Sequence, residues 1–117
     1  MEHEQVLHDI YDAFNRRDVE RVVAAMHEDV DWPNAWEGGR VRGRDGVRDY
    51  WARQFAQIDP RVDPVGISEG EDGRISVDVH QVVRGLDGAV LDDRTVIHVY
   101  AFRDGLVERM DVIEPED

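Results

Sequence analysis

The chain has 117 residues, and 14 basic side chains stand against 27 acidic ones, which gives a formal net charge of −13. A chain of this length forms a single domain, residues 1–117, with one hydrophobic core. The acidic balance excludes nucleic acid and anionic membrane surfaces as partners, because neutralising phosphates requires clustered cations. No stretch approaches the roughly 20 apolar residues that a membrane span needs.

The residue types that are missing narrow the chemistry further. The chain has no cysteine, which excludes disulfides and thiolate chemistry and fits a cytoplasmic protein. All of its basic residues are arginines, so Schiff-base chemistry on lysine is excluded. Ser68, Ser76 and Thr95 are the only aliphatic hydroxyls, and none lies in a nucleophile-elbow motif. We therefore expect proton transfer by His, Asp, Glu, Tyr or Asn, without a cofactor.

Three helices are predicted in the first half of the chain, at residues 2–16, 19–26 and 45–57. Asp18 is the expected N-cap of the second helix, and the glycines at residues 37–43 indicate a loop before the third. The apolar stripe of the first helix consists of residues three or four apart, Leu7, Ile10, Tyr11 and Phe14.

The second half changes to the period of two that is typical of strands. Strong strands are predicted at residues 75–84, 90–102 and 106–113, and a proline-containing edge strand at residues 61–68. A short strand at residues 30–32 precedes them. Three N-terminal helices followed by antiparallel strands predict an α+β fold, in which the helices pack on one face of a curved antiparallel β-sheet.

Hairpin register predicts which side chains share a face. A two-residue turn at residues 87–88 places His98 opposite Val77, and it places Val96 on the same helix-covered face. His80 falls on the outer face. A zinc site that joins the two histidines is therefore disfavoured, and we expect no metal.

The last hairpin leaves two registers open. A two-residue turn at residues 104–105 places His98 beside Asp111, whereas a three-residue turn with a glycine bulge places it beside Met110 and turns Asp111 outward. In the first register, the carboxylate raises the pKa of the imidazole and forms an acid–base pair. In the alternative, His98 is a core residue whose hydrogen bonds are satisfied by another partner.

Aromatic and amide side chains form the second set of candidates. Trp32 and Trp51 are expected to hold a planar ligand, although large aromatics on inner helix faces also simply fill cores. Asn34 either orients a substrate carbonyl or makes a turn. The arginines at positions 40, 42, 44 and 48 form either an anion site or a solvated cluster that meets nearby aspartates.

Four segments carry a resemblance that spans nearly the whole chain. They are IYDAFNRRD at residues 10–18, HEDV at 27–30, GRDGV at 43–47 and HVYAFRDGLVERMD at 98–111. The order of elements and these segments resemble the cystatin-like α+β barrel of the nuclear transport factor two-like superfamily, and most of all its SnoaL-like branch of polyketide cyclases.

The resemblance implies where a site should lie. Ketosteroid isomerases of this superfamily use a tyrosine, an aspartate base and a protonated aspartate, and these positions fall here near Ile10, Asn34 and His98. The hydroxyl and the base are then missing, which argues against that mechanism. The acid–base aspartate of the SnoaL-like cyclases falls on Asp111. The implied cavity walls are Trp32, Trp51, Val77, Val96, Tyr100 and Met110. A homodimer is also implied.

From these observations we expect a small-molecule pocket protein whose ligand is a small apolar or planar carbonyl compound. The favoured function is a cofactor-independent isomerase, cyclase or lyase, in which Asp111 and His98 move protons. One alternative is a binding protein that holds a small hydrophobe without converting it. Another is an assembly domain whose cavity is filled by its own aromatic side chains. Cavity volume separates the last from the others, because a drug-sized ligand needs about 300 Å³ or more.

Overall fold

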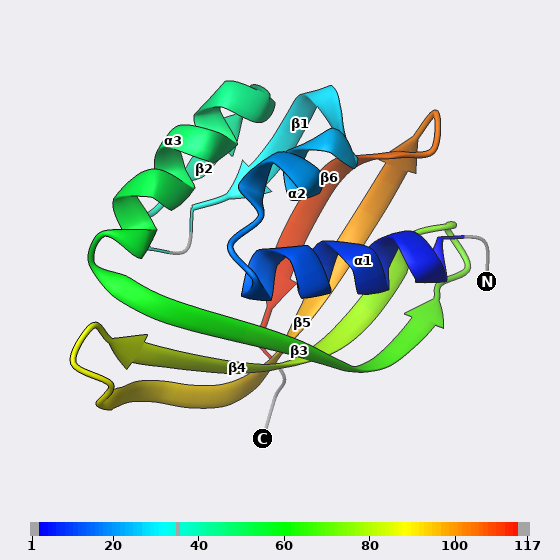
Figure 1. The fold of residues 1–117 in the computed structure, drawn as a ribbon. Coiled ribbons are helices and arrows are strands. Elements are labelled where there is room, and N and C mark those ends of the chain that lie inside the picture. The colour runs from blue at the N-terminus through cyan, green and yellow to red at the C-terminus, as the bar shows by residue number, and fades with distance from the viewer. Residues whose placement is uncertain (1–2, 35, 115–117) are drawn as a thin grey trace.

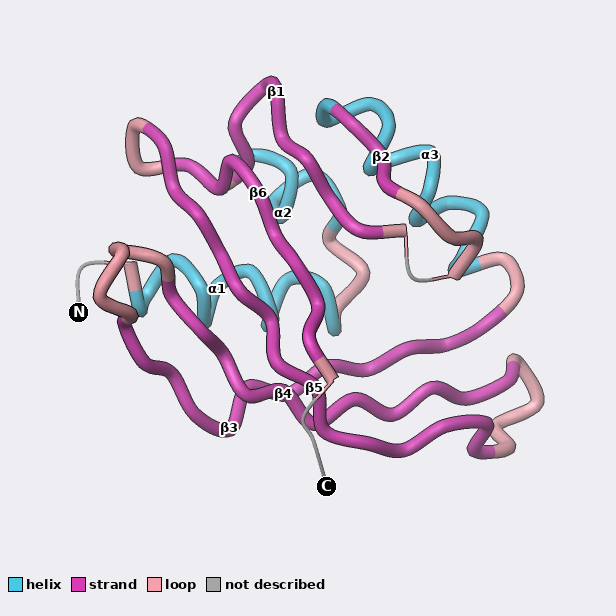
Figure 2. The backbone as a smooth tube through the Cα atoms, turned by 180° about the vertical axis from the view of Figure 1, so that it is seen from behind, coloured by secondary structure: helices cyan, strands magenta, loops and turns pink. Residues whose placement is uncertain are grey.

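The computed structural model of the chain describes residues 3–34 and 36–114. A strongly curved sheet carries three helices on its inner side, and the view from behind shows the sheet in front of the helices (Figures 1 and 2). The elements in chain order are α1 (Glu4–Asn15), α2 (Val19–Ala24), β1 (Met26–Pro33), β2 (Arg40–Arg42), α3 (Gly43–Phe55), β3 (Ile58–Glu69), β4 (Ile75–Gly85), β5 (Val90–Arg103) and β6 (Leu106–Ile113). The architecture is α+β, as the sequence predicts.

The six strands lie in the order β2-β1-β6-β5-β4-β3. All neighbours are antiparallel except β1 and β6, which pair in parallel. The parallel pair is a correction to the expected run of antiparallel strands. It extends β1 well beyond the predicted residues 30–32, because the strand gains backbone partners from a segment about eighty residues later.

The helices are less uniform than predicted. The first and third match their predicted ranges closely, but α2 has only six residues and ends where β1 begins. Asp18 caps α2 as expected, with its side chain accepting a hydrogen bond from the backbone N–H of Arg21. The third helix is preceded by two strands, since residues 40–42 of the predicted loop form β2.

The edge strand β3 is longer than its sequence suggests. It spans twelve residues, includes Pro60 and Pro64, and its register with β4 shifts between Pro64 and Gly66. Prolines are tolerated here because an edge strand has one side without ladder partners. Its outer edge and β2 are therefore the two ends of the sheet.

The hairpin of β4 and β5 has the predicted register over most of its length. Val77 lies opposite His98 and Val79 opposite Val96. The turn is one residue longer than predicted, with the Gly85 N–H bonded to the Ala89 carbonyl, and a bulge at Leu91 restores the pairing. His98 therefore faces the helices, and His80 lies on the outer face.

The core lies between the inner face of the sheet and the helices. Its largest members are aromatic side chains from α1, α3, β1 and β5, namely Tyr11, Tyr50, Trp51, Trp32 and Tyr100. No helix in the described part of the chain is long and apolar enough to cross a membrane.

Candidate functional site: a cavity with a buried hydroxyl relay

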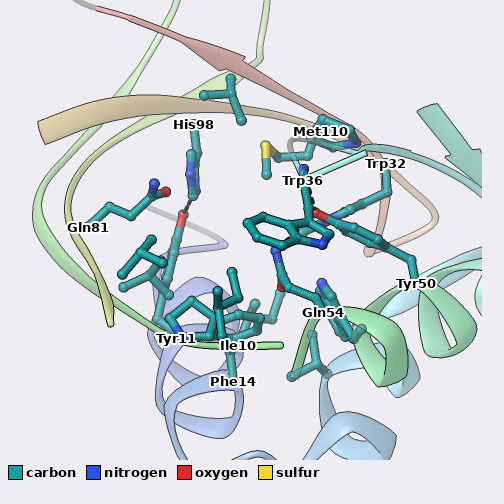
Figure 3. Close-up of a pocket in the computed structure, with 18 of the residues that line it drawn as sticks. Ile10, Tyr11, Phe14, Trp32, Trp36, Tyr50, Gln54, Gln81, His98 and Met110 are labelled. Atoms are coloured by element: carbon teal, nitrogen blue, oxygen red, sulfur yellow. Dashed lines mark hydrogen bonds between the residues drawn. The ribbon is translucent and has the colours of Figure 1, made fainter. Parts of the chain in front are cut away.

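A cavity of about 290 Å³ opens between the helices and the inner face of the sheet (Figure 3). Its walls come from all three helices and from all of the strands except β2, and they are mostly apolar or aromatic. The volume lies at the lower end of the range for small-molecule sites. The aromatic residues of the core therefore leave room for a ligand.

Three polar side chains on the cavity wall form a continuous hydrogen-bonded relay. The hydroxyl of Tyr100 donates to the hydroxyl oxygen of Tyr11 at 2.7 Å. The Tyr11 hydroxyl lies 2.7 Å from Nδ1 of His98. All three residues are nearly inaccessible from outside, with exposed fractions of 1%, 3% and 6% respectively.

The relay fixes where the protons lie. Because Tyr100 donates to Tyr11, the Tyr11 proton is left for Nδ1 of His98, which accepts it. A neutral imidazole with an accepting Nδ1 carries its own proton on Nε2. The relay therefore ends in an Nε2–H donor.

Nε2 of His98 is reached from the cavity. This nitrogen has no hydrogen-bond partner among the described residues. In the same residues, every side-chain nitrogen or oxygen that is inaccessible does have a partner, so Nε2 is accessible. His98 is part of the cavity wall, where its ring stands beside Tyr11 and Gln81 (Figure 3). The donor is thus available to a bound molecule.

Burial keeps all three members of the relay uncharged near neutral pH. It lowers the pKa of His98 to about 4, because the imidazolium would lose its hydration. It raises the pKa of Tyr11 and of Tyr100 well above the ordinary value for the same reason. The expectation that a carboxylate raises the pKa of His98 is therefore wrong.

Asp111 is not the partner of His98. The turn at Asp104 and Gly105 has two residues, as in the first predicted register, but a bulge at Glu108 then shifts the strand by one residue. Asp111 consequently lies opposite Val99, and His98 lies opposite Val112. This correction separates the expected acid–base pair across the two faces of the sheet.

On the outer face, Asp111 belongs to a network of ion pairs. Arg109 binds both of its carboxylate oxygens, at 2.9 and 3.0 Å, and Arg40 donates to one of them at 3.0 Å. The hydrogen bond from Arg109 is the main reason that the pKa of Asp111 lies below its usual value. The nearly buried Asp31 joins the network through the same two arginines. Asp111 thus has a structural role there.

Asn34 makes a turn and is not among the residues that line the cavity. Its side-chain oxygen accepts from the backbone N–H of Glu37 at 2.7 Å, and its amide donates to the Glu37 carboxylate at 3.0 Å. Arg53 binds the same carboxylate at 2.9 and 3.0 Å, which lowers the pKa of Glu37 to about 2. This loop carries Trp36, whose half-exposed indole lies over the cavity (Figure 3).

The remaining predicted site residues either line the cavity or are buried in the core outside it. Trp32 and Trp51 line the cavity and meet edge to face, with ring centres 5.7 Å apart, and Tyr100 and Met110 line it as well. Val77 and Val96 lie on the predicted face but are buried in the core outside the cavity lining.

Each arginine of the predicted cationic cluster has a protein partner. Arg40 and Arg42 pair with Asp31, Arg44 donates to the Met26 carbonyl, and Arg48 pairs with Glu20 and Asp45. These contacts favour the structural interpretation of the cluster over an anion site.

Tyr11 is a candidate site residue that the sequence analysis missed. The hydroxyl judged absent near Ile10 is supplied by the next residue, one position along the same helix. A signal was present, because Tyr11 is the only member of the apolar stripe with a polar atom, and a buried hydroxyl needs a partner.

The chain is similar to known proteins of this fold. Residues 7–110 match the SnoaL-like domain family. TerC, co-crystallised with polyporic acid, and an NTF2-like protein of unknown function from Burkholderia pseudomallei are each 25% identical to it, with a TM-score of 0.84 over 98% of this chain and 92% of theirs. A putative polyketide cyclase from Sinorhizobium meliloti shares the fold at 17% identity, with a TM-score of 0.75 over 92% of this chain and 93% of that one. No curated protein matches the sequence.

Proposed function

Since the chain belongs to the SnoaL-like domain family, we propose that its cavity binds a small planar carbonyl compound and promotes an isomerisation or cyclisation through the enolate, without a cofactor. One observation carries the proposal: the Nε2–H of His98 ends a buried hydroxyl relay and is accessible from an apolar cavity. TerC was co-crystallised with polyporic acid, and we propose that this chain likewise takes a small organic ligand.

The relay supplies a donor to the ligand oxygen. The Nε2–H of His98 donates to the carbonyl. The Tyr11 hydroxyl, which accepts from Tyr100, donates to Nδ1 and holds the imidazole in the donating tautomer. As negative charge develops on that oxygen, the prearranged donor stabilises it. Removing one such donor costs about 10²–10³ in rate in acyl-transfer enzymes. A neutral imidazole is suited to this task because its own proton stays in place.

The donor, and not a side-chain base, carries the proposed acceleration. The only carboxylate on the described cavity wall is Asp92, which lies at the mouth and is paired with Arg94 at 2.9 Å. In the proposed step, the C–H bond next to the carbonyl breaks, its proton passes to water at the mouth, and the electron pair forms the enolate. A proton returned to a second carbon completes an isomerisation. In a cyclisation, the enolate carbon forms a bond to a second carbonyl carbon, the π electrons of that carbonyl pass to its oxygen, and the proton returns from water to this oxygen.

Hydrogen exchange tests this function without knowledge of the natural substrate. Methyl naphthyl ketone is a planar aromatic ketone whose methyl protons exchange with D₂O through the enolate, and proton NMR follows the loss of its methyl signal. We expect the protein to accelerate this exchange. His98→Leu should reduce the acceleration about 100-fold, whereas Asp111→Asn on the outer face should leave it unchanged.

The result that contradicts the proposal is also defined. Exchange at the rate of buffer alone excludes enolate chemistry in this cavity. If the ketone still binds, the protein is a carrier of small hydrophobes. If Asp111→Asn reduces exchange as much as His98→Leu does, the relay is not the source of the acceleration.

A further inference from the structure

We infer that the cavity selects molecules without net charge and rejects carboxylates of the same shape. This inference rests on the proposed function, because it names the class of ligand that the same cavity takes. Its basis is the distribution of charge along the described cavity wall. Asp92 and Arg94 are the only charged residues there, and both lie at the mouth with nearly half of their side-chain surface exposed.

The single cation at the mouth is already neutralised. Nε of Arg94 pairs with the Asp92 carboxylate at 2.9 Å, and its terminal nitrogen binds the carboxylate of Glu114. The three residues together carry a net charge of −1. An anion that approaches the cavity therefore meets a negative rim on a protein whose net charge is −13.

Inside the cavity, the polar groups are dipoles without net charge. The relay of Tyr100, Tyr11 and His98 is neutral near pH 7, since burial lowers the pKa of the imidazole and raises those of both phenols. Two glutamines, Gln54 and Gln81, also face it, and Gln54 donates to the Tyr50 hydroxyl at 3.1 Å. The Gln81 amide makes no side-chain hydrogen bond within the described residues and lies beside His98 (Figure 3).

This arrangement serves a carbonyl but not a carboxylate. A ketone oxygen needs one donor, which Nε2–H of His98 supplies, and its ring fits the aromatic walls. A carboxylate brings a full charge into an apolar cavity whose one cation among the described residues, Arg94 at the mouth, is already paired. The transfer of an unpaired charge from water is strongly unfavourable. We expect the affinity for a ketone to be about 100-fold higher than the affinity for a carboxylate of the same shape.

Two ligands that differ in one group test the selection. Methyl naphthyl ketone and naphthoate carry the same ring with the substituent at the same position, and quenching of tryptophan fluorescence reports binding of each. At about pH 7 the ketone should bind about 100-fold more tightly. Between about pH 7 and pH 5, the apparent affinity for naphthoic acid should rise about tenfold in total, as its neutral form increases. The ketone should show no such change.

A charge placed on the cavity wall gives a second, independent measurement. Gln81→Arg adds a cation where a neutral amide now stands, and we expect it to strengthen naphthoate binding about tenfold at pH 7. The matched variant Gln81→Glu should weaken naphthoate binding further. The ratio of naphthoate affinity to ketone affinity is the quantity compared among the wild type and the two variants, because a change in cavity shape affects both ligands.

The outcomes separate this inference from the proposed function. Naphthoate that binds as well as the ketone at pH 7 overturns the charge selection, whatever the exchange assay shows. Failure of both compounds to bind overturns it too. If the ketone is preferred about 100-fold but its methyl protons exchange no faster than in buffer, the selection stands and the proposed catalysis fails.

Discussion

Tyr11 connects the fold of this protein to its proposed chemistry. Its ring lies on the apolar stripe of α1, and its hydroxyl is bonded on both sides, to Tyr100 and to His98. A phenol is well suited to this position because it fills core volume and still carries one polar atom to a partner. The same hydroxyl determines which nitrogen of His98 carries the proton.

Replacing Tyr11 with phenylalanine should affect stability and chemistry together. Tyr11→Phe leaves the Tyr100 hydroxyl and Nδ1 of His98 without their partner in a buried site, which costs about 1–3 kcal/mol of unfolding free energy. Denaturant unfolding measures this loss. The nitrogen chemical shifts of His98 should also change, because Nδ1 no longer has a fixed donor. Tyr100→Phe is the control, since it leaves the Tyr11–His98 bond in place and should preserve the tautomer.

His98 should make stability depend on pH. Its pKa in the folded protein is about 4, against about 6.5 in an unfolded chain. Between these values the unfolded state binds more protons, so the stability of the fold rises with pH through this window. The contribution of His98 to the free energy of unfolding is fully present above about pH 6.5, and about 3 kcal/mol of it is lost as the pH falls to about 4.

The comparison with His98→Gln isolates this contribution from the many carboxylates. The difference in unfolding free energy between the wild type and the variant should shrink by about 3 kcal/mol between pH 7 and pH 4. A difference that stays constant across this range would show that His98 titrates normally in the folded protein.

At the scale of elements, the bulge at Glu108 decides which side chains of β6 lie on the outer face of the sheet. Asp31 and Asp111 lie on the outer face of β1 and β6, and Arg40 and Arg109 bind both of them. The network joins these two parallel strands to the short edge strand β2. The network therefore stabilises the sheet, and it lies on the face opposite the cavity.

The two aspartates should differ in their contribution to stability. Asp31→Asn removes a carboxylate with 10% of its side chain exposed and leaves Arg40 and Arg109 with Asp111 as their one remaining carboxylate, so we expect a loss of about 3 kcal/mol. Asp111→Asn removes one with 31% exposed and should cost about 1 kcal/mol or less. Urea unfolding of the two variants tests this order. A larger loss for Asp111→Asn would contradict the assignment of Asp31 as the centre of the network.

The elements were predictable where one local signal decides them. The apolar stripe of α1, the Asp18 cap and the two-residue turn at Asp104 and Gly105 all appear as the sequence indicates. The bulge at Glu108 carries no such signal, because no glycine or proline marks it. A shift of one residue reverses every later side chain on a strand. Asp111 therefore moved from the expected site to the opposite face.

Contacts distant in sequence explain the other differences. The early part of β1 pairs with β6, where the Val107 N–H bonds the carbonyl of Ala25, and this pairing ends α2 two residues before the predicted position. The relay joins Tyr11 to residues almost ninety positions later. Such pairings depend on the packing of α1 against the sheet, which periodicity alone does not specify. The homodimer that the resemblance implies stays a prediction.

At the scale of the whole molecule, a small domain keeps a cavity of about 290 Å³ next to its core. Unfilled space reduces the dispersion contacts of the surrounding side chains. A domain of 117 residues has a narrow margin of stability, on the order of 5–15 kcal/mol. We expect such a cavity to be kept where ligand binding requires it. Filling it should therefore raise the stability of the fold and lower the affinity for the ligand.

Val62→Phe tests this exchange. Val62 lies on β3, is 8% exposed and lines the cavity, and its backbone is hydrogen-bonded to the side chain of Asn15 at the end of α1. A phenylalanine side chain placed there extends into free space, and the added apolar burial should stabilise the fold by about 1 kcal/mol. Thermal unfolding should show a rise of about 4 °C. The affinity for methyl naphthyl ketone should fall more than about tenfold, because the ring and the ligand compete for one volume.

Val65→Phe on the same strand is the matched control, since Val65 is 66% exposed and its substitution should change neither the stability nor the affinity. A Val62→Phe protein that is less stable and still binds the ketone would show that the cavity is not the ligand site.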